Sequence, residues 1–401
     1  MRFSGSFLIA IVMVGAWAPV TSAQTSEDPS DTARLRFGPL GVTPSVAVTN
    51  FGVDGNVFNE VDDPKKDFTF VLSPQMQSWF RAGRSRTAAS LRTDLVYFQQ
   101  YASERSVDAD LDARIDIPGN RLTPWLSGGY ANGRQRVGYE IDLRSRRVAK
   151  DVGVGIAARV ASKTRVLLSG QRTRYAYDAD AILLGTSLQE VLNHTSQSID
   201  LQLHHTLTAL TTVVIQGQGL RDRFEFAQQR DADSIRVQGG VDLDPLALIA
   251  GRVRVGYRRF KGVGGGLPEF TGLVATVGAN FTVAGRTKVD VTGDRDVSYS
   301  FEREYPYYVL TGAIVTATPR LTEKWDVQLR TGRQRLAYRA LEFVAAQGRI
   351  DRYTVLGTGV GYHVGREMRV GFNVDRERRS SAIDLRQYHG YRLGTSVTYG
   401  R

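Results

Sequence analysis

The chain has 401 residues, with 52 Lys or Arg against 41 Asp or Glu and a formal net charge of +11. The positive charge is scattered along the whole sequence instead of forming one basic patch, which argues against nucleic acid as a partner. The absence of cysteine excludes disulfides and thiolate metal sites.

The first 23 residues have the features of a secretory signal peptide. Arg2 supplies the positive start, residues 7–14 form an apolar core, and residues 21–23 (Thr-Ser-Ala) provide a small-residue cleavage site. The apolar stretch is too short and interrupted to span a bilayer comfortably. We therefore expect residues 1–23 to be removed, leaving a mature chain that begins near Gln24.

Residues 24–38 are polar, acidic at first and without periodicity, and we expect a flexible periplasmic segment there. From residue 46 onward, segments of alternating apolar and polar side chains follow one another, with no helical pattern between them. The alternating segments 67–80 and 87–101 are separated only by residues 81–86, which predicts a hairpin.

Residues 108–117 show the alternation clearly, because Asp108, Asp110, Asp112, Arg114 and Asp116 alternate with apolar residues. Carboxylates facing hydrocarbon would carry a heavy desolvation cost, so this row is expected to face water. The row also begins like a calcium-binding loop. Ala113 and Gly119 stand where that loop needs Gly and Glu, so no metal site is predicted.

Residues 287–301 repeat the pattern, with Val289, Val291, Val297, Tyr299 and Phe301 on the apolar face. Along the chain, every second connection is short, as at 161–164, 208–211, 284–286 and 365–367. The connections between them are mostly longer, as at 177–195, 340–348 and 378–389. Short periplasmic turns and longer extracellular loops are typical of an outer-membrane barrel.

Aromatic residues lie near the expected ends of the strands, as two interfacial girdles would require. Those predicted beside short turns are Trp79, Trp125 and Trp325, and those predicted near long loops are Tyr97, Tyr101, Tyr257, Tyr299, Phe301, Tyr305 and Tyr307.

The polar face of the strands carries charges of both signs, which predicts the lining of a pore or a salt-bridged wall. The candidate pore-lining residues are Arg92, Asp94, Arg114, Arg252, Arg254, Asp290, Asp294, Asp326, Arg330 and Arg369. The basic segment 133–150 is a candidate contact for an acidic polysaccharide, for lipopolysaccharide phosphates or simply for solvent.

No catalytic, cofactor-binding or metal-binding residue is predicted. The five histidines lack the motif of a hydrolase. The glycine-rich run 262–266 is not followed by a phosphate-binding lysine, and a surface loop is expected there.

The sequence Pro44-Ser45-Val46, followed by residues 52–58 (Gly-Val-Asp-Gly-Asn-Val-Phe), resembles the first strand of the outer-membrane β-barrel porins associated with exopolysaccharide gene clusters. Ser73-Pro74 and the segment 97–101 extend the resemblance. It implies a barrel that lets polysaccharide or small solutes cross, without enzymatic residues. The last strand, 391–399, keeps the aromatic and apolar parity that barrel assembly machinery reads.

We therefore predict one all-β, antiparallel transmembrane barrel over residues 39–401, in the outer membrane, with about eighteen strands and sixteen as the alternative. The predicted function is a passive porin-like channel or a part of exopolysaccharide export. The alternatives are a barrel enzyme acting on lipid or glycan, and a structural or adhesive barrel. Expected partners are outer-membrane lipid and lipopolysaccharide, the barrel assembly machinery, and an acidic polysaccharide or its export machinery. No cofactor and no nucleic acid are expected.

Overall fold

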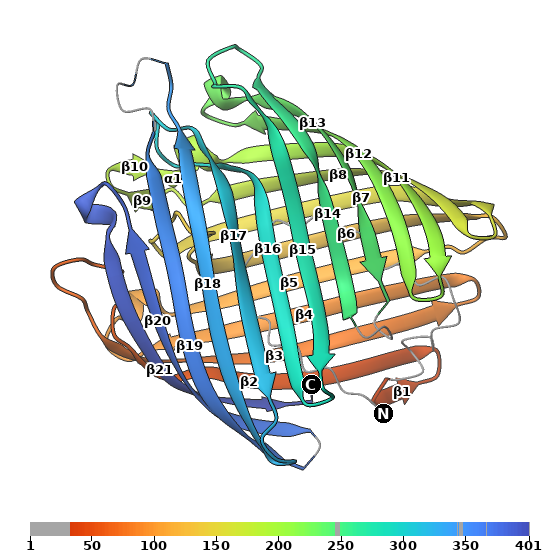
Figure 1. Ribbon diagram of the computed structural model, residues 1–401, viewed down its shortest axis with the longest axis horizontal. Coiled ribbons are helices and arrows are strands. Elements are labelled where there is room, and N and C mark those ends of the chain that lie inside the picture. The colour runs from red at the N-terminus through yellow and green to blue at the C-terminus, as the bar shows by residue number, and fades with distance from the viewer. Residues whose placement is uncertain (1–32, 245–248, 343, 345–347, 366, 401) are drawn as a thin grey trace.

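A computed structural model describes residues 33–244, 249–342, 344, 348–365 and 367–400. In this part of the chain, nineteen strands form one antiparallel sheet, which closes on itself where β2 pairs with β21 (Figure 1). Eighteen of these strands make the wall, which confirms the predicted barrel and its strand number. The predicted signal peptide, residues 1–23, lies outside the described residues.

The strands of the wall are β2 (Leu40–Asp54), β3 (Asp67–Ala82), β4 (Ser85–Phe98), β5 (Ser106–Asp116), β6 (Leu122–Gln135), β7 (Ser145–Ala161), β8 (Thr164–Tyr177), β11 (His194–Thr208), β12 (Thr211–Phe224), β13 (Ala232–Leu243), β14 (Ile249–Gly262), β15 (Phe270–Val283), β16 (Thr287–Tyr299), β17 (Tyr307–Pro319), β18 (Trp325–Arg339), β19 (Ile350–Val364), β20 (Met368–Ser380) and β21 (Tyr388–Tyr399). Each pairs antiparallel with its neighbours. Closure matters because it leaves the sheet with no unpaired edge, which a lipid environment does not tolerate.

The nineteenth strand, β1 (Leu35–Phe37), pairs with the first residues of β2, where Leu35 faces Val42. The pairing of β2 with β21 begins only at Val46 and Tyr399. β1 therefore extends the sheet beyond the end of β21. Its three residues lie within the segment 24–38 that the sequence shows as non-periodic, and residues 24–32 of that segment lie outside the described residues.

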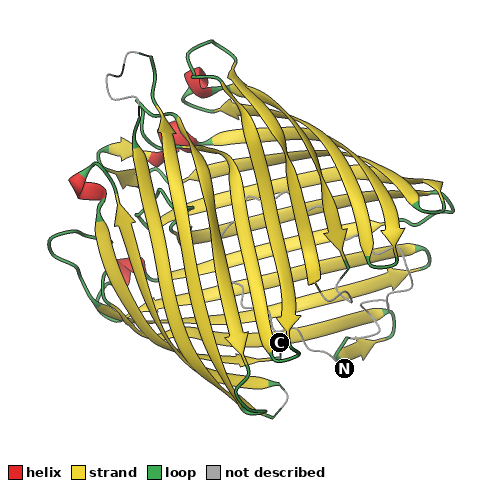
Figure 2. Ribbon diagram, viewed as in Figure 1, coloured by secondary structure: helices red, strands yellow, loops and turns green. Residues whose placement is uncertain are grey.

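The two rims of the barrel differ as predicted. The connections on one rim span two to five residues, from 83–84 to 320–324, and those on the other span seven to sixteen, of which 178–193 is the longest. β2 begins and β21 ends at the short-turn rim. The helices and the two-stranded sheet of β9 (Ile182–Leu183) and β10 (Thr186–Ser187) lie in the long loops (Figure 2).

These helices are α1 (Leu188–Leu192), η2 (Ala102–Glu104), η3 (Gln228–Arg230) and η4 (Asp384–Arg386). In the described part of the chain, no helix is long and apolar enough to cross a membrane.

Alternate residues of each wall strand point to opposite faces, with apolar side chains outside and polar side chains inside. On β11, Ile199 and Leu201 are 68% and 53% exposed on the outer face, while Asp200 is 6% exposed on the inner face. The hydrophobic effect favours removing the outer row from water, at about 25 cal/mol per Å² of apolar surface. The exposed apolar belt is therefore suited to hydrocarbon and the inner row to a polar interior.

The aromatic prediction is only partly correct. Trp325 and Tyr257 do lie on the outer face, 46% and 64% exposed. Trp125 points inward, beneath the Arg114 guanidinium at 4.1 Å. Trp79 is half-buried on the same parity as inward-facing Ser73.

Three aromatics predicted for the long-loop girdle are instead buried near the long-loop end of β16 and β17: Phe301, Tyr305 and Tyr307. Tyr299, predicted for the same girdle, is partly buried against them. β16 pairs with β15 only as far as Arg295 and Ala275. Beyond that point the β16–β17 hairpin leaves the wall and bends inward. Tyr299 then contacts His194 of β11, Phe224 of β12 and Phe260 of β14. The alternation of apolar and polar residues along β16 cannot reveal this bend, because the bend depends on where the pairing with β15 ends.

Candidate functional site

The interior of the barrel contains a cavity of about 1570 Å³. At one end it is lined by residues of the short turns, including Arg286, Glu323 and Glu367. At the other end it is lined by Tyr139 and Ile141 of the long loop between β6 and β7. The cavity therefore runs from the short-turn rim to a group of inward-folded long loops.

Among the described residues, charges of both signs line this cavity in equal number. The basic side chains are Arg92, Arg134, Arg136, Arg144, Arg286, Lys288, Arg320, Arg330, Arg369 and Arg392, and the acidic ones are Asp54, Asp94, Asp108, Asp142, Asp290, Glu323, Asp326, Glu367, Asp375 and Glu377. A lining of this kind presents donors and acceptors without a strong net field of one sign.

Many of these charges are held in pairs along the wall. Arg392 bridges Asp54 and Glu377 at 3.1 Å each. Asp326 accepts hydrogen bonds from Arg369 at 2.5 and 2.8 Å and lies 2.7 Å from His363 Nε2. Such pairs fix the side chains and leave their remaining polar atoms to face the cavity.

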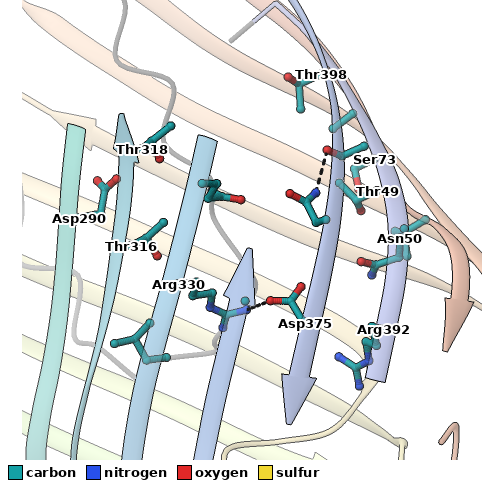
Figure 3. Close-up of a pocket in the computed structure, with 18 of the residues that line it drawn as sticks. Thr49, Asn50, Ser73, Asp290, Thr316, Thr318, Arg330, Asp375, Arg392 and Thr398 are labelled. Carbon is teal, nitrogen blue, oxygen red and sulfur yellow. Dashed lines mark hydrogen bonds and ion pairs between the residues drawn. The ribbon is translucent and has the colours of Figure 1, made fainter. Parts of the chain in front are cut away.

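One pair crosses an entire strand. Arg330 of β18 and Asp375 of β20 approach to 3.8 Å over β19, turned toward each other in Figure 3. Both face Gly357 in the register of the sheet. A Cβ at Gly357 would lie 2.1 Å from the Asp375 carboxylate, so only glycine leaves room for this carboxylate.

The ten candidate pore-lining residues divide into two sets. Those that border the cavity are Arg92, Asp94, Asp290, Asp326, Arg330 and Arg369. The other four lie on wall strands outside its lining. Arg114 binds Asp116 at 2.7 Å, and Arg254 binds Asp242 at 2.7 Å. Arg252 faces Asp242 across β13 and β14, and Asp294 faces Thr276 across β15 and β16.

At its long-loop end the cavity is bordered by the loop 136–144. This loop contacts several other segments, and we call the whole group the outer plug: residues 136–144, α1, residues 300–306, Arg349 and η4. Glu140, 2% exposed, joins two of these segments from distant parts of the chain. Its carboxylate accepts hydrogen bonds from Ser300 Oγ at 2.6 Å and from the Phe301 backbone N–H at 3.2 Å. Arg386 of η4 donates to the Glu140 carbonyl.

A network of buried ion pairs connects the segments of the plug. Arg386 binds Glu302 at 3.1 Å and Asp142 at 3.4 Å. Glu302 is also bound by Arg349 at 2.6 Å. Asp142 is also bound by Arg379 at 2.8 Å. Because each carboxylate has two guanidinium partners, the network offsets the desolvation of its charges and holds three loops together.

Arg349 and Arg379 also tie this network to the wall. Both bind Asp351 at the start of β19, at 2.9 and 2.7 Å, and Asp351 is fully buried. Arg230 of η3 donates to the backbone carbonyls of Ser300 and Glu302.

Apolar contacts complete the plug. Leu188, Val191 and Leu192 of α1 pack with Ile141 and Phe301 in one buried cluster. Ser187 caps the helix by accepting a hydrogen bond from Glu190 N at 3.4 Å. Arg386 lies over the Phe301 ring at 5.0 Å. The plug is therefore a small folded unit with its own core.

Burial changes the acidity of several groups in these loops. It raises the pKa of Glu140, and the nearby Arg386 guanidinium opposes this shift only in part. Burial also raises the pKa of Tyr139 to about 12 and lowers the pKa of Arg144 to about 10, where Glu104 acts in the opposite direction.

Two arginines of the basic segment 133–150 make internal contacts. Arg136 donates to the carbonyls of Val57 and Asp142. Arg144 donates to the carbonyls of Glu104 and Arg134 at 2.8 and 2.7 Å. Both side chains therefore fix the loop between β6 and β7, while Lys150 of the same segment is exposed.

Two of the five histidines make contacts within the wall. His194 lies between the rings of Tyr175 and Phe224, and His204 Nε2 lies 2.8 Å from the Gln202 side chain. Among the described residues, no group of three or more His, Asp or Glu side chains is arranged to hold a metal ion.

Few residues of the outer plug could be recognised from the sequence. Glu140, Asp142 and Glu302 stand in polar loops and look like solvated charges. The buried aromatics Phe301 and Tyr305 beside them were the available signal, because large apolar side chains in a loop favour a buried loop.

The sequence matches the family described as "Putative beta-barrel porin 2" over residues 28–401. No curated protein matches it. Among solved structures, Pseudomonas aeruginosa OccK2 (OpdF), crystallised with glucuronate, has 9% identity and a TM-score of 0.49, over 89% of this chain and 98% of that chain. A BenF-like porin from Pseudomonas fluorescens Pf-5 has 10% identity and a TM-score of 0.47, over 90% and 99% of the two chains.

Proposed function

The chain belongs to the Putative beta-barrel porin 2 family, and from this premise we propose that it carries small charged or zwitterionic solutes passively through its cavity, past a movable outer plug. It is an outer-membrane β-barrel channel. The observation that carries the proposal is that the cavity ends at loops and not at strands of the wall. Loops can move without breaking the hydrogen-bonded sheet, so the path can open while the barrel stays intact.

The solute class follows from the cavity lining. Ten positive and ten negative side chains of the described residues border it, so a solute that carries both signs would find partners along the whole path. The six predicted lining residues that border the cavity would be part of this path. We propose no chemical step for this chain, which acts as a conduit.

Exopolysaccharide export is a weaker proposal for this structure. A polymer would need a continuous opening, and the outer plug occupies the long-loop end of the cavity. Arg136 and Arg144 of the basic segment expected to meet an acidic polysaccharide make internal contacts instead. The channel for small solutes requires only that the plug open transiently.

Planar-bilayer conductance of the purified full-length protein tests the proposal. We expect brief, low-conductance openings separated by long closed periods. Liposome swelling should show faster entry of zwitterionic amino acids than of neutral sugars of the same size. The proposal fails if neither the native protein nor a variant with a weakened plug conducts at any voltage. Block of the current by a soluble polyuronate but not by monomeric uronate would favour the export function instead.

A further inference from the structure

The outer face of β18, β19 and β20 carries a group of arginines near the long-loop rim, which we call the outer arginine patch: Arg333, Arg335, Arg352, Arg376 and Arg378. All five are exposed. Arg335 lies directly opposite Arg352 in the register of β18 and β19. Arg378 lies opposite Thr354, which is itself opposite Arg333. The five arginines therefore occupy neighbouring positions on one surface of the sheet.

The patch has no internal counter-charge. The outward positions of these three strands hold no Asp or Glu. In the described residues, none of the five arginines forms an ion pair with a carboxylate. Like charges directly opposite each other destabilise a sheet, so the patch is unfavourable in the isolated protein.

The opposite side of the barrel is built differently. There, several outward basic residues at the same rim pair with carboxylates of the protein: Arg146 with Asp178 at 3.8 Å, Arg174 with Glu225 at 3.1 Å, Arg223 with Asp233 at 2.8 Å and Lys261 with Glu269 at 3.2 Å. Arg172, Arg221 and Arg259 are exposed on that side without an ion pair among the described residues. Carboxylates therefore lie among the basic residues on that side of the rim, whereas the outward positions of β18, β19 and β20 hold none.

The position of the outer arginine patch along the strands indicates which layer of the membrane it contacts. On β18 the outward residues from Trp325 to Thr331 are mostly apolar, and Arg333 follows eight residues beyond Trp325. This is about 26 Å along the strand at about 3.3 Å per residue, or about 20 Å in height for a strand tilted by about 40°. On β20 the apolar outward residues Phe372 and Val374 precede Arg376. A barrel's lipid-facing belt is about 25 Å tall. The patch therefore begins where the hydrocarbon ends, at the headgroup level of the long-loop side.

Tyr391 supports this placement. It is exposed on the outer face of β21, directly opposite Arg376, whose guanidinium lies 5.6 Å from the centre of its ring. Tyrosine is typical of the boundary between hydrocarbon and headgroups.

We propose that the outer arginine patch binds the phosphate groups of a phosphorylated glycolipid in the outer leaflet of the membrane. Guanidinium pairs with phosphate through two parallel hydrogen bonds, and several arginines close together can share the phosphates of one headgroup. A second copy of this chain is a poor occupant, because its identical patch would repel this one. The inference depends on the outer-membrane location and not on the proposed transport function.

The test compares two variants that lose the same charge. The patch variant is Arg333→Gln, Arg335→Gln, Arg352→Gln and Arg378→Gln. The control variant is Arg146→Gln, Arg174→Gln, Arg223→Gln and Lys261→Gln, which removes the paired basic residues of the opposite side. Binding of bis-phosphorylated lipid A and of dephosphorylated lipid A to each purified, folded barrel is measured in detergent solution by native mass spectrometry.

We expect the native protein to prefer the phosphorylated lipid. The patch variant should bind it roughly tenfold or more weakly, since each basic side chain near an anionic headgroup contributes several-fold. The control variant should stay within about twofold of the native protein.

Three results would overturn the proposal. These are equal binding of the phosphorylated and dephosphorylated lipids, an equal loss in both variants, and tight binding of soluble polygalacturonate by the patch without any binding of lipid A. Folding is checked by the heat-dependent shift in gel mobility that folded barrels show. If the patch variant does not assemble, Arg335→Gln with Arg352→Gln is compared with Arg174→Gln plus Arg223→Gln by the same criteria.

Discussion

Replacing Arg386 with Gln should open the outer plug. This side chain is 2% exposed and contacts two other segments of the outer plug. It binds Asp142 in the β6–β7 loop and Glu302 in the β16–β17 loop, and it donates to the Glu140 carbonyl. Glutamine keeps much of the volume but loses the positive charge, so the substitution weakens the contacts between loops without leaving a large void.

The expected loss of closed-state stability depends on the ion pairs that Asp142 and Glu302 keep in the variant. Asp142 keeps Arg379 at 2.8 Å, and Glu302 keeps Arg349 at 2.6 Å. Neither carboxylate is left without a partner, so the cost should fall at the low end of that for breaking a buried pair, about 3 kcal/mol. At 1.4 kcal/mol per factor of ten, the ratio of closed to open channels falls about 150-fold.

Single-channel recording in planar bilayers measures that ratio as the time spent closed and open. The matched control is Arg303→Gln, which lies in the same loop as Glu302. Arg303 pairs with Glu190 at 3.2 Å, with side chains 71% and 59% exposed. An exposed pair contributes only about 0–1 kcal/mol, so the control should leave gating nearly unchanged. If Arg386→Gln opens no more often than this control, the ion-pair network does not hold the plug closed.

Three further predictions follow from the same structure. Burial raises the pKa of Glu140 in the closed plug, so the closed state binds a proton more readily than the open one. The closed state should therefore be most stable at acidic pH and become less stable as the pH rises through the raised pKa. In the Glu140→Gln variant, the open fraction should depend less on pH. Gly155→Ala would place a Cβ 2.6 Å from the Trp125 ring. The free energy of unfolding should fall by about 1–3 kcal/mol, with a lower melting temperature and altered Trp fluorescence. An unchanged melting curve would contradict this packing. Arg330→Gln with Arg392→Gln removes two positive charges from a balanced lining, so reversal potentials in a KCl gradient should shift toward cation selectivity, and no shift would mean that ions bypass these residues.

Much of the fold could be predicted from the sequence because the alternation of a barrel strand is local. Asp110, Asp112 and Arg114 face the interior while Leu111 and Ile115 face outward, as their order along the chain requires. The alternation of short and long connections also predicted that the first and last strands of the wall begin and end at the short-turn rim. A closed sheet leaves each strand two faces and two neighbours, so parity and turn length carry most of the information.

The closure of the lumen depends on contacts that no local pattern contains. Glu140 and Ser300 are 160 positions apart, and they meet only because the β6–β7 and β16–β17 loops both fold into the same end of the barrel. The alternation of β16 correctly placed Asp290 inside, yet the same alternation placed Tyr299 on the lipid face. The tertiary structure reversed that assignment, since the strand leaves the wall once its pairing with β15 ends at Arg295. The sequence alone thus determined a barrel with a wet interior and an apolar exterior, while packing between distant loops decided which loops fold together at its outer end.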